Sequence, residues 1–242
     1  MKSTAAVFLS ILVSAGAAQA QTPAPQPEHS FAFNVGAVSD YRYRGISQSR
    51  LRPALQGGVD YTHASGAYLG AWATSIRWIK DGGGSADLEL DLYGGYRFGV
   101  GPLGLDVGVL TYNYPDHGLA ISPNTQEAYV GASWGPATLK YSHAFSNLFG
   151  FADSKNSYYV DLSASFDLGQ GWSLVPHVGY QKIKNNDPFS YTDYSLAVNK
   201  DFGNGLSASA AWVGTDSKGL YLAPSGKNLA RDGLVLGVKY SF

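Results

Sequence analysis

The chain has 242 residues, with 17 Lys and Arg against 18 Asp and Glu, and only 14% of its residues are charged. Ordinary soluble domains have about 25% charged residues, so the chain is poor in charge, and its near-zero balance excludes a polybasic nucleic-acid-binding protein. Cysteine is absent, which excludes a disulfide framework and a thiolate metal site.

The chain begins with the features of a secretory signal peptide. Lys2 is followed by an apolar stretch over residues 5–18, which ends in Ala18-Gln19-Ala20. A basic start, an apolar centre and an Ala-x-Ala end predict export and cleavage after Ala20. Residues 21–30 contain three prolines and are expected to form an extended linker before the single domain, 31–242. No later apolar run approaches the roughly 18 residues of a spanning helix, which excludes a helical membrane protein.

From Phe31 onward, apolar and polar residues alternate in stretches separated by Gly, Pro, Asn or Asp. Twelve segments show this pattern and are predicted to be strands: 31–44, 54–63, 67–77, 87–98, 103–113, 125–134, 137–146, 157–167, 172–183, 191–202, 206–215 and 232–242. Short and longer intervals alternate between them. This arrangement predicts an up-and-down meander that has all its tight turns at one end.

Alternation alone also fits a soluble sandwich or a lipocalin-type barrel with its apolar face inside. Two features favour a membrane barrel. The segments have about the 9–11 residues that cross a bilayer at a tilt, against 5–6 in average soluble strands, and aromatic residues gather near the segment ends, as interfacial girdles require. The sequence therefore predicts an all-β fold, a transmembrane antiparallel barrel of about 12 strands in the bacterial outer membrane, with short periplasmic turns and longer outer loops.

The last segment ends in a pattern typical of outer-membrane insertion. Every second residue from Leu234 to Phe242 is large and apolar, including Tyr240. A terminal Phe on such a strand resembles the insertion signal of bacterial outer-membrane barrels. Tyr240 and Phe242 are therefore predicted to mark the chain for periplasmic chaperones and the barrel-assembly machinery, which would place it in outer-membrane lipid.

A family resemblance is carried by residues 34–49, NVGAVSDYRYRGISQS, and residues 53–61, PALQGGVDY. Together they resemble the opening signature of the TorF-type porins, exported bacterial proteins without an assigned function. The similarity is specific over residues 31–74 and continues beyond them only as a strand pattern. It implies an outer-membrane porin, and it supplies neither a solute nor catalytic residues.

If lipid covers the apolar face of each strand, the other face lines a lumen. The ionisable residues predicted on that face are Asp40, Arg42, Arg44, Asp60, Glu89, Asp91, Arg97, Asp106, Glu127, Asp161, Asp193 and Lys239. The eight acids exceed the four bases, so a conducting pore is expected to prefer cations modestly. Twelve strands lie between filled eight-stranded barrels and open sixteen-stranded channels, so a narrow polar pore and a packed, salt-bridged interior both fit. Segments 67–77 and 137–146 are apolar on both faces, and their facing stays open.

Asp40, Arg42 and Arg44 occupy alternate positions of the first segment and therefore one predicted strand face. Opposite charges two residues apart can pair on a pleated face, so the group is either a structural ion pair near the outer rim or a charged eyelet that sorts solutes by sign. If the two arginines alone formed the constriction, the pore would favour anions despite its acidic total.

The favoured function is passive diffusion of small hydrophilic solutes or ions, without a cofactor or a bound metal. The alternatives are a lipid-modifying enzyme of the Ser/His type and a structural or adhesive barrel that transports nothing. His143 and Ser146 are the main catalytic candidates, but residues three apart point to opposite faces of a strand. The weaker two-residue candidates are His63 with Ser65 and Asp116 with His117. No catalytic residue is assigned, and the five histidines show no metal-ligand spacing.

Overall fold

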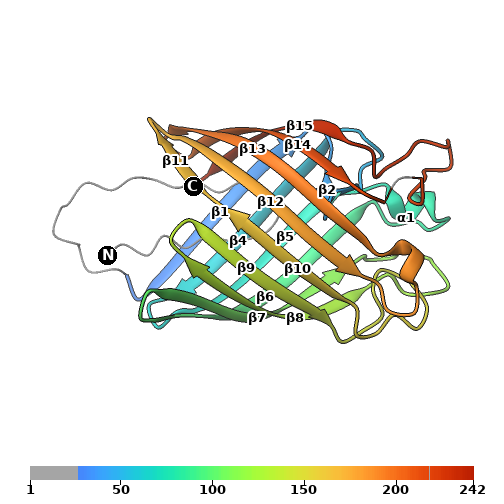
Figure 1. Ribbon diagram of the computed structural model, residues 1–242, viewed down its shortest axis with the longest axis horizontal. Helices are drawn as coiled ribbons and strands as arrows, with labels where there is room; N and C mark the ends of the chain where they lie inside the picture. The colour runs from blue at the N-terminus through green and yellow to red at the C-terminus, as the bar shows by residue number, and fades with distance from the viewer. Residues whose placement is uncertain (1–26, 218) are drawn as a thin grey trace.

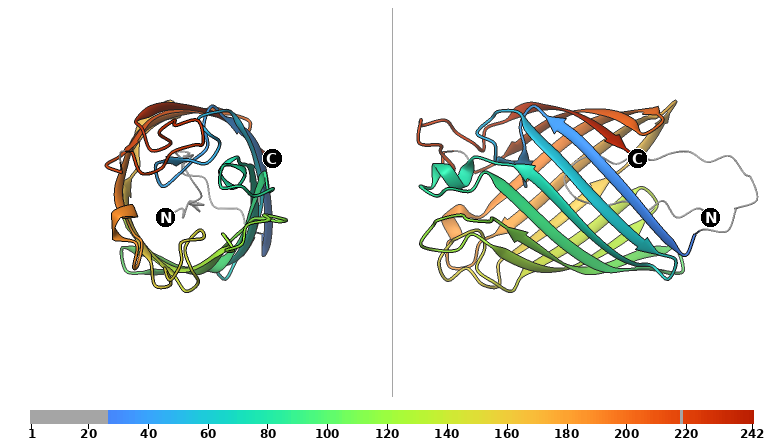
Figure 2. Two further views of the ribbon diagram at one scale, coloured as in Figure 1. Left: turned by 90° about the vertical axis from the view of Figure 1, so that its right-hand side faces the viewer. Right: turned by 180° about the vertical axis from the view of Figure 1, so that it is seen from behind.

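The computed structural model describes residues 27–217 and 219–242, and the predicted signal peptide lies outside them. The described residues form a barrel of tilted antiparallel strands around a central lumen (Figures 1 and 2). The wall strands are β1 (His29–Val38), β4 (Ala54–His63), β5 (Ala67–Ser75), β6 (Leu88–Val100), β7 (Leu103–Asn113), β8 (Thr125–Trp134), β9 (Ala137–Ala144), β10 (Tyr158–Ala164), β11 (Phe166–Gly169), β12 (Trp172–Lys182), β13 (Tyr191–Gly203), β14 (Leu206–Thr215) and β15 (Gly233–Ser241).

These thirteen strand segments make twelve strands of the wall, because β10 and β11 are separated only by Ser165 and both pair with β12. Successive wall strands pair with each other, and β1 pairs with both β4 and β15, which closes the sheet. Closure leaves no free sheet edge, which is the condition for a β-structure to cross a bilayer. The prediction of an all-β, twelve-stranded up-and-down barrel is confirmed.

The predicted strand boundaries lie close to the observed ones, and β4, β7, β8 and β14 begin and end at the predicted residues. Each of the five tight turns contains a glycine with positive φ, a conformation that glycine adopts without steric cost: Gly66, Gly101, Gly135, Gly171 and Gly205. All five turns lie at one end of the barrel, here called the turn end, and the longer connections form the loop end (Figure 1).

The strands expose large apolar side chains on the outside of the barrel and turn most polar side chains inward. The two segments whose facing the sequence leaves open follow the same rule. In β5, Leu69 is exposed whereas Tyr68 is buried, and in β9, Leu139 is exposed whereas Ser142 is buried. The lumen therefore receives aromatic as well as charged side chains.

The first predicted strand, 31–44, is wrong at its C-terminal end. β1 ends at Val38, and residues 39–53 turn inward and contain a short hairpin of β2 (Arg42–Tyr43) and β3 (Ile46–Ser47). Arg44 and Gly45, with φ values of 45° and 82°, form the turn of this hairpin. Seen from the loop end, the segment lies inside the ring of strands (Figure 2). We call residues 39–53 the inward hairpin.

Two short helices lie in the connections at the loop end, α1 (Trp78–Asp81) and the 3₁₀-helix η1 (Asp187–Phe189). Ile79 of α1 is fully buried in a cluster that includes Tyr41 and Trp72, so α1 packs with the inward hairpin and the wall. Within the described ranges, no helix is long and apolar enough to span a membrane.

Leu196→Arg should lower the free energy of unfolding by about 2–4 kcal/mol, because a cation at the bilayer midplane costs that much. Leu196 is 50% exposed on the outer face of β13, whereas the neighbouring Ser195 lines the lumen. Ser195→Arg is the matched control and should cost much less. Urea titration of the protein refolded in lipid vesicles measures both values, and equal losses would show that lipid does not cover the outer face.

Deletion of Phe242 should reduce the amount of assembled barrel severalfold, because this residue extends the pairing of β15 with β1. The Phe242 N–H donates to the Phe33 carbonyl (3.0 Å), the Phe33 N–H donates back (2.9 Å), and the two rings stack at 5.8 Å. Phe242→Tyr keeps these features and should assemble normally. The amount of heat-modifiable protein in the outer-membrane fraction is the readout, and wild-type amounts of the truncated barrel would contradict the insertion role.

Candidate functional site

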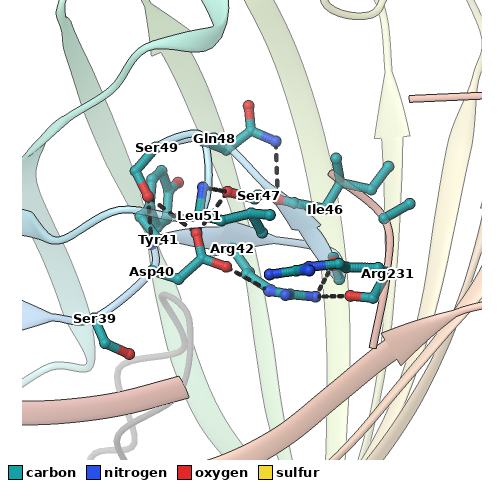
Figure 3. A network of polar contacts seen from close by, with 12 residues as sticks. Ser39, Asp40, Tyr41, Arg42, Ile46, Ser47, Gln48, Ser49, Leu51 and Arg231 are labelled. Atoms are coloured by element: carbon teal, nitrogen blue, oxygen red, sulfur yellow. Dashed lines mark hydrogen bonds and ion pairs between the residues drawn. The ribbon is translucent and has the colours of Figure 1, made fainter. Parts of the chain in front are cut away.

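Asp40 holds the base of the inward hairpin (Figure 3). Its carboxylate accepts hydrogen bonds from Ser47 Oγ (2.5 Å), Ser49 Oγ (3.1 Å) and Arg42 Nε (2.8 Å). Asp40 and Arg42 are each only 6% exposed, so the two charges form a buried ion pair. Buried charges of this kind are stable only when they are paired and hydrogen-bonded, as they are here. Asp40 and Arg42 thus pair inside the hairpin and do not stand in a row on a strand face.

A second set of bonds ties the inward hairpin to the loop that precedes β15. Arg42 Nη1 donates to the Arg231 carbonyl (2.6 Å), as Figure 3 shows, and also to the Gly45 carbonyl (3.2 Å). The Ser47 N–H donates to the Leu229 carbonyl (2.9 Å). The hairpin is therefore attached both at its own base and to a second connection of the loop end.

Arg44, at the tip of the inward hairpin, reaches the facing side of the lumen. Its guanidinium donates to Glu127 Oε2 on β8 (2.7 Å) and to Gln181 Oε1 on β12 (2.5 Å). The same group lies 4.1 Å from the centre of the Tyr159 ring on β10, a cation–π distance. Arg44 therefore narrows the lumen by bridging from the hairpin to three wall strands.

Tyrosine hydroxyls satisfy two of the other acids at this level. Glu89 accepts hydrogen bonds from Tyr41 (2.6 Å) and Tyr114 (2.8 Å), and Asp193 accepts one from Tyr159 (2.9 Å). Both carboxylates are almost completely buried, at 1% and 2% exposure. These hydroxyl donors satisfy carboxylate oxygens without a second ion, because hydrogen bonds to a carboxylate are strong.

Asp91 differs from these acids. It is 1% exposed, and its Oδ1 has no hydrogen-bond partner among residues 27–217 and 219–242. Glu127 Oε1 is likewise buried and unpartnered within the described chain, although Glu127 Oε2 holds Arg44. An unpaired buried carboxylate oxygen is costly. Glu127 has at least an arginine on its other oxygen, whereas no ion pair within the described chain holds Asp91.

The inward hairpin separates two cavities. The outer cavity, on the loop side, has a volume of ≈ 340 Å³ and is lined mainly by aromatic and aliphatic side chains such as Trp78 and Tyr221. The inner cavity, towards the turn end, has a volume of ≈ 190 Å³ and is lined by Arg42 and Arg44 of the hairpin and by Asp91, Lys140 and His177 among others. Tyr43 lines both, so the cavities adjoin at the hairpin.

The pKa values of Tyr221 and Asp87, in the connections at the loop end, are shifted. Burial raises the pKa of Tyr221, whose hydroxyl donates to the Phe189 carbonyl (2.8 Å) and so links two connections. The hydrogen bond from Lys80 (2.9 Å) lowers the pKa of Asp87, because it stabilises the charged carboxylate. Both interactions persist at neutral pH.

Deeper in the lumen, the charged residues pair with each other or with polar neighbours. The pairs are Asp60 with Tyr93 (2.5 Å), Arg97 with Asp106 (3.3 Å) and Asp161 with His177 (2.5 Å). Lys239 is half-buried on β15. Sequence reasoning missed Lys140, His177 and Gln181. Lys140 lies in a segment that looks apolar on both faces, and the outward Leu139 and Tyr141 beside it are the signal that could have placed it inside.

The main catalytic candidates have separate partners. His143 hydrogen-bonds to Tyr141 (3.0 Å) and Asn156 (3.2 Å), whereas Ser146 Oγ accepts the Gln126 N–H (2.8 Å). The geometry therefore gives Ser146 no base in the described chain.

His63 and His117 close turns, and His29 lies opposite His63. His63 Nδ1 lies 2.8 Å from Ser65 Oγ and accepts the Ser65 N–H (3.1 Å), which closes the β4–β5 turn. His117 Nδ1 accepts a backbone N–H within its own loop (3.0 Å). In the described ranges, one group of three potential metal ligands lies within 4.8 Å, namely Glu28, His29 and His63. Residue spacing does not predict this group, because only the register of β1 with β4 places His29 opposite His63.

A closed twelve-stranded barrel with an apolar exterior, a charged lumen and an inward hairpin has the fold of the porins. Over residues 20–242 the chain matches the family described as "Bacterial protein of unknown function (Gcw_chp)", and it belongs to that family. No curated protein sequence matches it.

Solved porin structures share the fold. The chain is similar to a structure described as "KdgM porin", with a TM-score of 0.58 and 9% identity, over 87% of this chain and 99% of that one. It is also similar to one described as "NanC porin", with a TM-score of 0.59 and 11% identity, again over 87% of this chain and 99% of that one.

Asp40→Ala should release the inward hairpin, because it removes the acceptor that holds Ser47, Ser49 and Arg42. Trypsin added to reconstituted barrels should then cut after arginines within residues 42–52, where the wild type is protected. The control is Asp153→Asn, an exposed loop change that tolerates the positive φ of 54° at that position. Equal protection of Asp40→Ala and the wild type would contradict the anchoring role of Asp40.

Proposed function

We propose that this chain is a porin of the bacterial outer membrane through which small hydrophilic solutes and ions diffuse passively. The observation that carries the proposal is the pair of cavities that adjoin at the inward hairpin inside a closed barrel with an apolar exterior. The signal-peptide pattern and the resemblance of residues 31–74 to the TorF-type porins agree with it. The inward hairpin would then be the constriction that sets the size limit.

The charges around the hairpin favour cations. Six acids, namely Asp40, Glu89, Asp91, Glu127, Asp161 and Asp193, lie in or beside the inner cavity with three bases, Arg42, Arg44 and Lys140, an excess of three carboxylates. Each arginine is paired with one of these acids, so the pair does not act as a free cationic eyelet. Charges in a confined low-dielectric pore are poorly screened, and the remaining acids would therefore attract cations.

One of the solved porins is described in complex with "disordered oligogalacturonate". An oligomeric carboxylate would meet an excess of acids at the constriction, and like charges in a low-dielectric site repel strongly. The shared fold is compatible with a different solute, because selectivity depends on the side chains that line the lumen.

Planar-bilayer recording of the refolded protein should show discrete conductance steps with a modest cation preference in a KCl gradient. The preference should weaken as salt rises, because the Debye length falls from about 10 Å at 0.1 M to about 3 Å at 1 M. Arg44→Ser should increase both the conductance and the cation preference, because it removes the bridge across the lumen. An absence of conductance would favour the filled or adhesive barrel, and anion selectivity lost in Arg42→Ser/Arg44→Ser would establish an arginine eyelet.

A further inference from the structure

We infer that Asp91 and the inner cavity beneath the inward hairpin form a binding site for the ammonium or guanidinium group of a small organic cation. This inference deepens the proposed function and rests on it only in naming the class of solute that the channel would favour. It is carried by three features of the described residues: an unpartnered acid, a cavity of suitable size and lining, and a cation that the protein already holds nearby.

The unpartnered acid is Asp91. Its side chain lines the inner cavity, it is 1% exposed, and Oδ1 has no partner within the described chain. Among the neighbouring acids, Glu89 is held by two tyrosine hydroxyls, and Glu127, whose Oε1 is also unpartnered in the described chain, is held by Arg44 through Oε2. A buried carboxylate without a donor is destabilising by itself, whereas a cation that supplies N–H donors would compensate it.

The inner cavity has the size and chemistry for an organic cation. A cavity of about 150 Å³ accepts benzene, which has six heavy atoms, so ≈ 190 Å³ suits a solute of similar size. Its wall combines the carboxylate of Asp91 with the rings of Tyr41 and Tyr112 and the aliphatic side chains of Leu110 and Val175. Alkyl carbons can pack against the apolar part while the charged end reaches the acid.

A bare divalent metal fits this place less well. Ca²⁺ takes six to eight oxygen ligands and Zn²⁺ usually takes four ligands, so either ion needs several ligating groups that converge on one point. The group of three potential ligands within 4.8 Å that occurs in the described ranges is Glu28, His29 and His63, and it does not include Asp91. Asp91 therefore acts as a single strong acceptor, which suits one ammonium or guanidinium head.

Arg44 shows how this lumen holds an organic cation. Its guanidinium lies between the Glu127 carboxylate (2.7 Å), the Gln181 amide (2.5 Å) and the face of the Tyr159 ring (4.1 Å). Arg44 belongs to the protein and pairs with the carboxylate of Glu127. Asp91 has no such partner within the described chain, so its carboxylate is available to another cation. Arg42, Arg44 and Lys140 line the cavity, and the six acids in or beside it exceed these three bases, so a second cation can enter without net repulsion.

Isothermal titration calorimetry on the detergent-refolded protein with 1,4-diaminobutane tests the inference without requiring conductance. The diamine has six heavy atoms and should bind, whereas 1,4-butanediol, of the same length but neutral, should not. Asp91→Asn should weaken the diamine Kd tenfold or more, and Asp91→Glu should restore most of the binding. Asp201→Asn, which removes one acid near the turn end, is the matched control and should change the Kd less than twofold.

Three results of the calorimetry would overturn the inference: no heat with the diamine, equal binding of the diol, or an unchanged Kd in Asp91→Asn while its heat-modifiable barrel is intact. Recording K⁺ current in bilayers with added diamine tests the binding site separately from the proposed function. If the channel conducts but the diamine neither binds nor blocks it, the porin proposal stands and the binding site is refuted. If the diamine binds in an Asp91-dependent way to a barrel that carries no current, the binding site stands and the porin proposal is refuted.

Discussion

The seam between β1 and β15 is the constraint on which the rest of the structure depends. It spans five register pairs, from Asn34 with Ser241 to Val38 with Gly237, and Phe242 extends it at the turn end. At the loop end, Ser39 finishes it, because its N–H donates to the Leu236 carbonyl (2.8 Å) and its Oγ accepts the Leu236 N–H (2.9 Å). Beyond Ser39 the chain leaves the wall, so the pairing that removes the sheet edge also starts the inward hairpin.

The chemistry of the lumen follows from burying acids inside this closed wall. Burial makes every uncompensated charge costly. Asp40 and Glu127 are each paired with an arginine, and Glu89 and Asp193 accept hydrogen bonds from tyrosine hydroxyls. Asp91 lacks such a partner within the described residues. A fold tolerates an unpartnered buried polar group mainly at a functional site. Asp91 therefore indicates a ligand-binding site, whereas the acids that have hydrogen-bond partners indicate a structural role.

The sequence predicts the wall well because a strand in a barrel has a period of two and ends where glycine turns or loops begin. It fails where that signal is ambiguous. Alternation runs on through Arg44, so the pattern alone extends β1 past Val38, and only tertiary contacts of Asp40 show that the chain has turned inward. The inward facing of Tyr68 in β5 could not be predicted either, because its segment is apolar on both faces.

Contacts between strands that are far apart in the sequence cannot be predicted from the spacing of residues. Arg44 meets Glu127 and Gln181 only because the barrel closes around the hairpin, and no local rule relates these positions in the chain. The alternation does indicate that Glu127 belongs to the lumen, but not which cation it binds.

The most direct test of the account is the accessibility of the inner cavity from the loop side of an open pore. The chain has no cysteine, so Ser195→Cys, a residue that lines this cavity, introduces a single reactive site. We predict that a cationic methanethiosulfonate reagent added on the loop side passes the inward hairpin, modifies this cysteine and reduces the channel current in irreversible steps. A cysteine that stays unmodified from that side while the protein is folded would show that the hairpin seals the barrel, and would contradict the account.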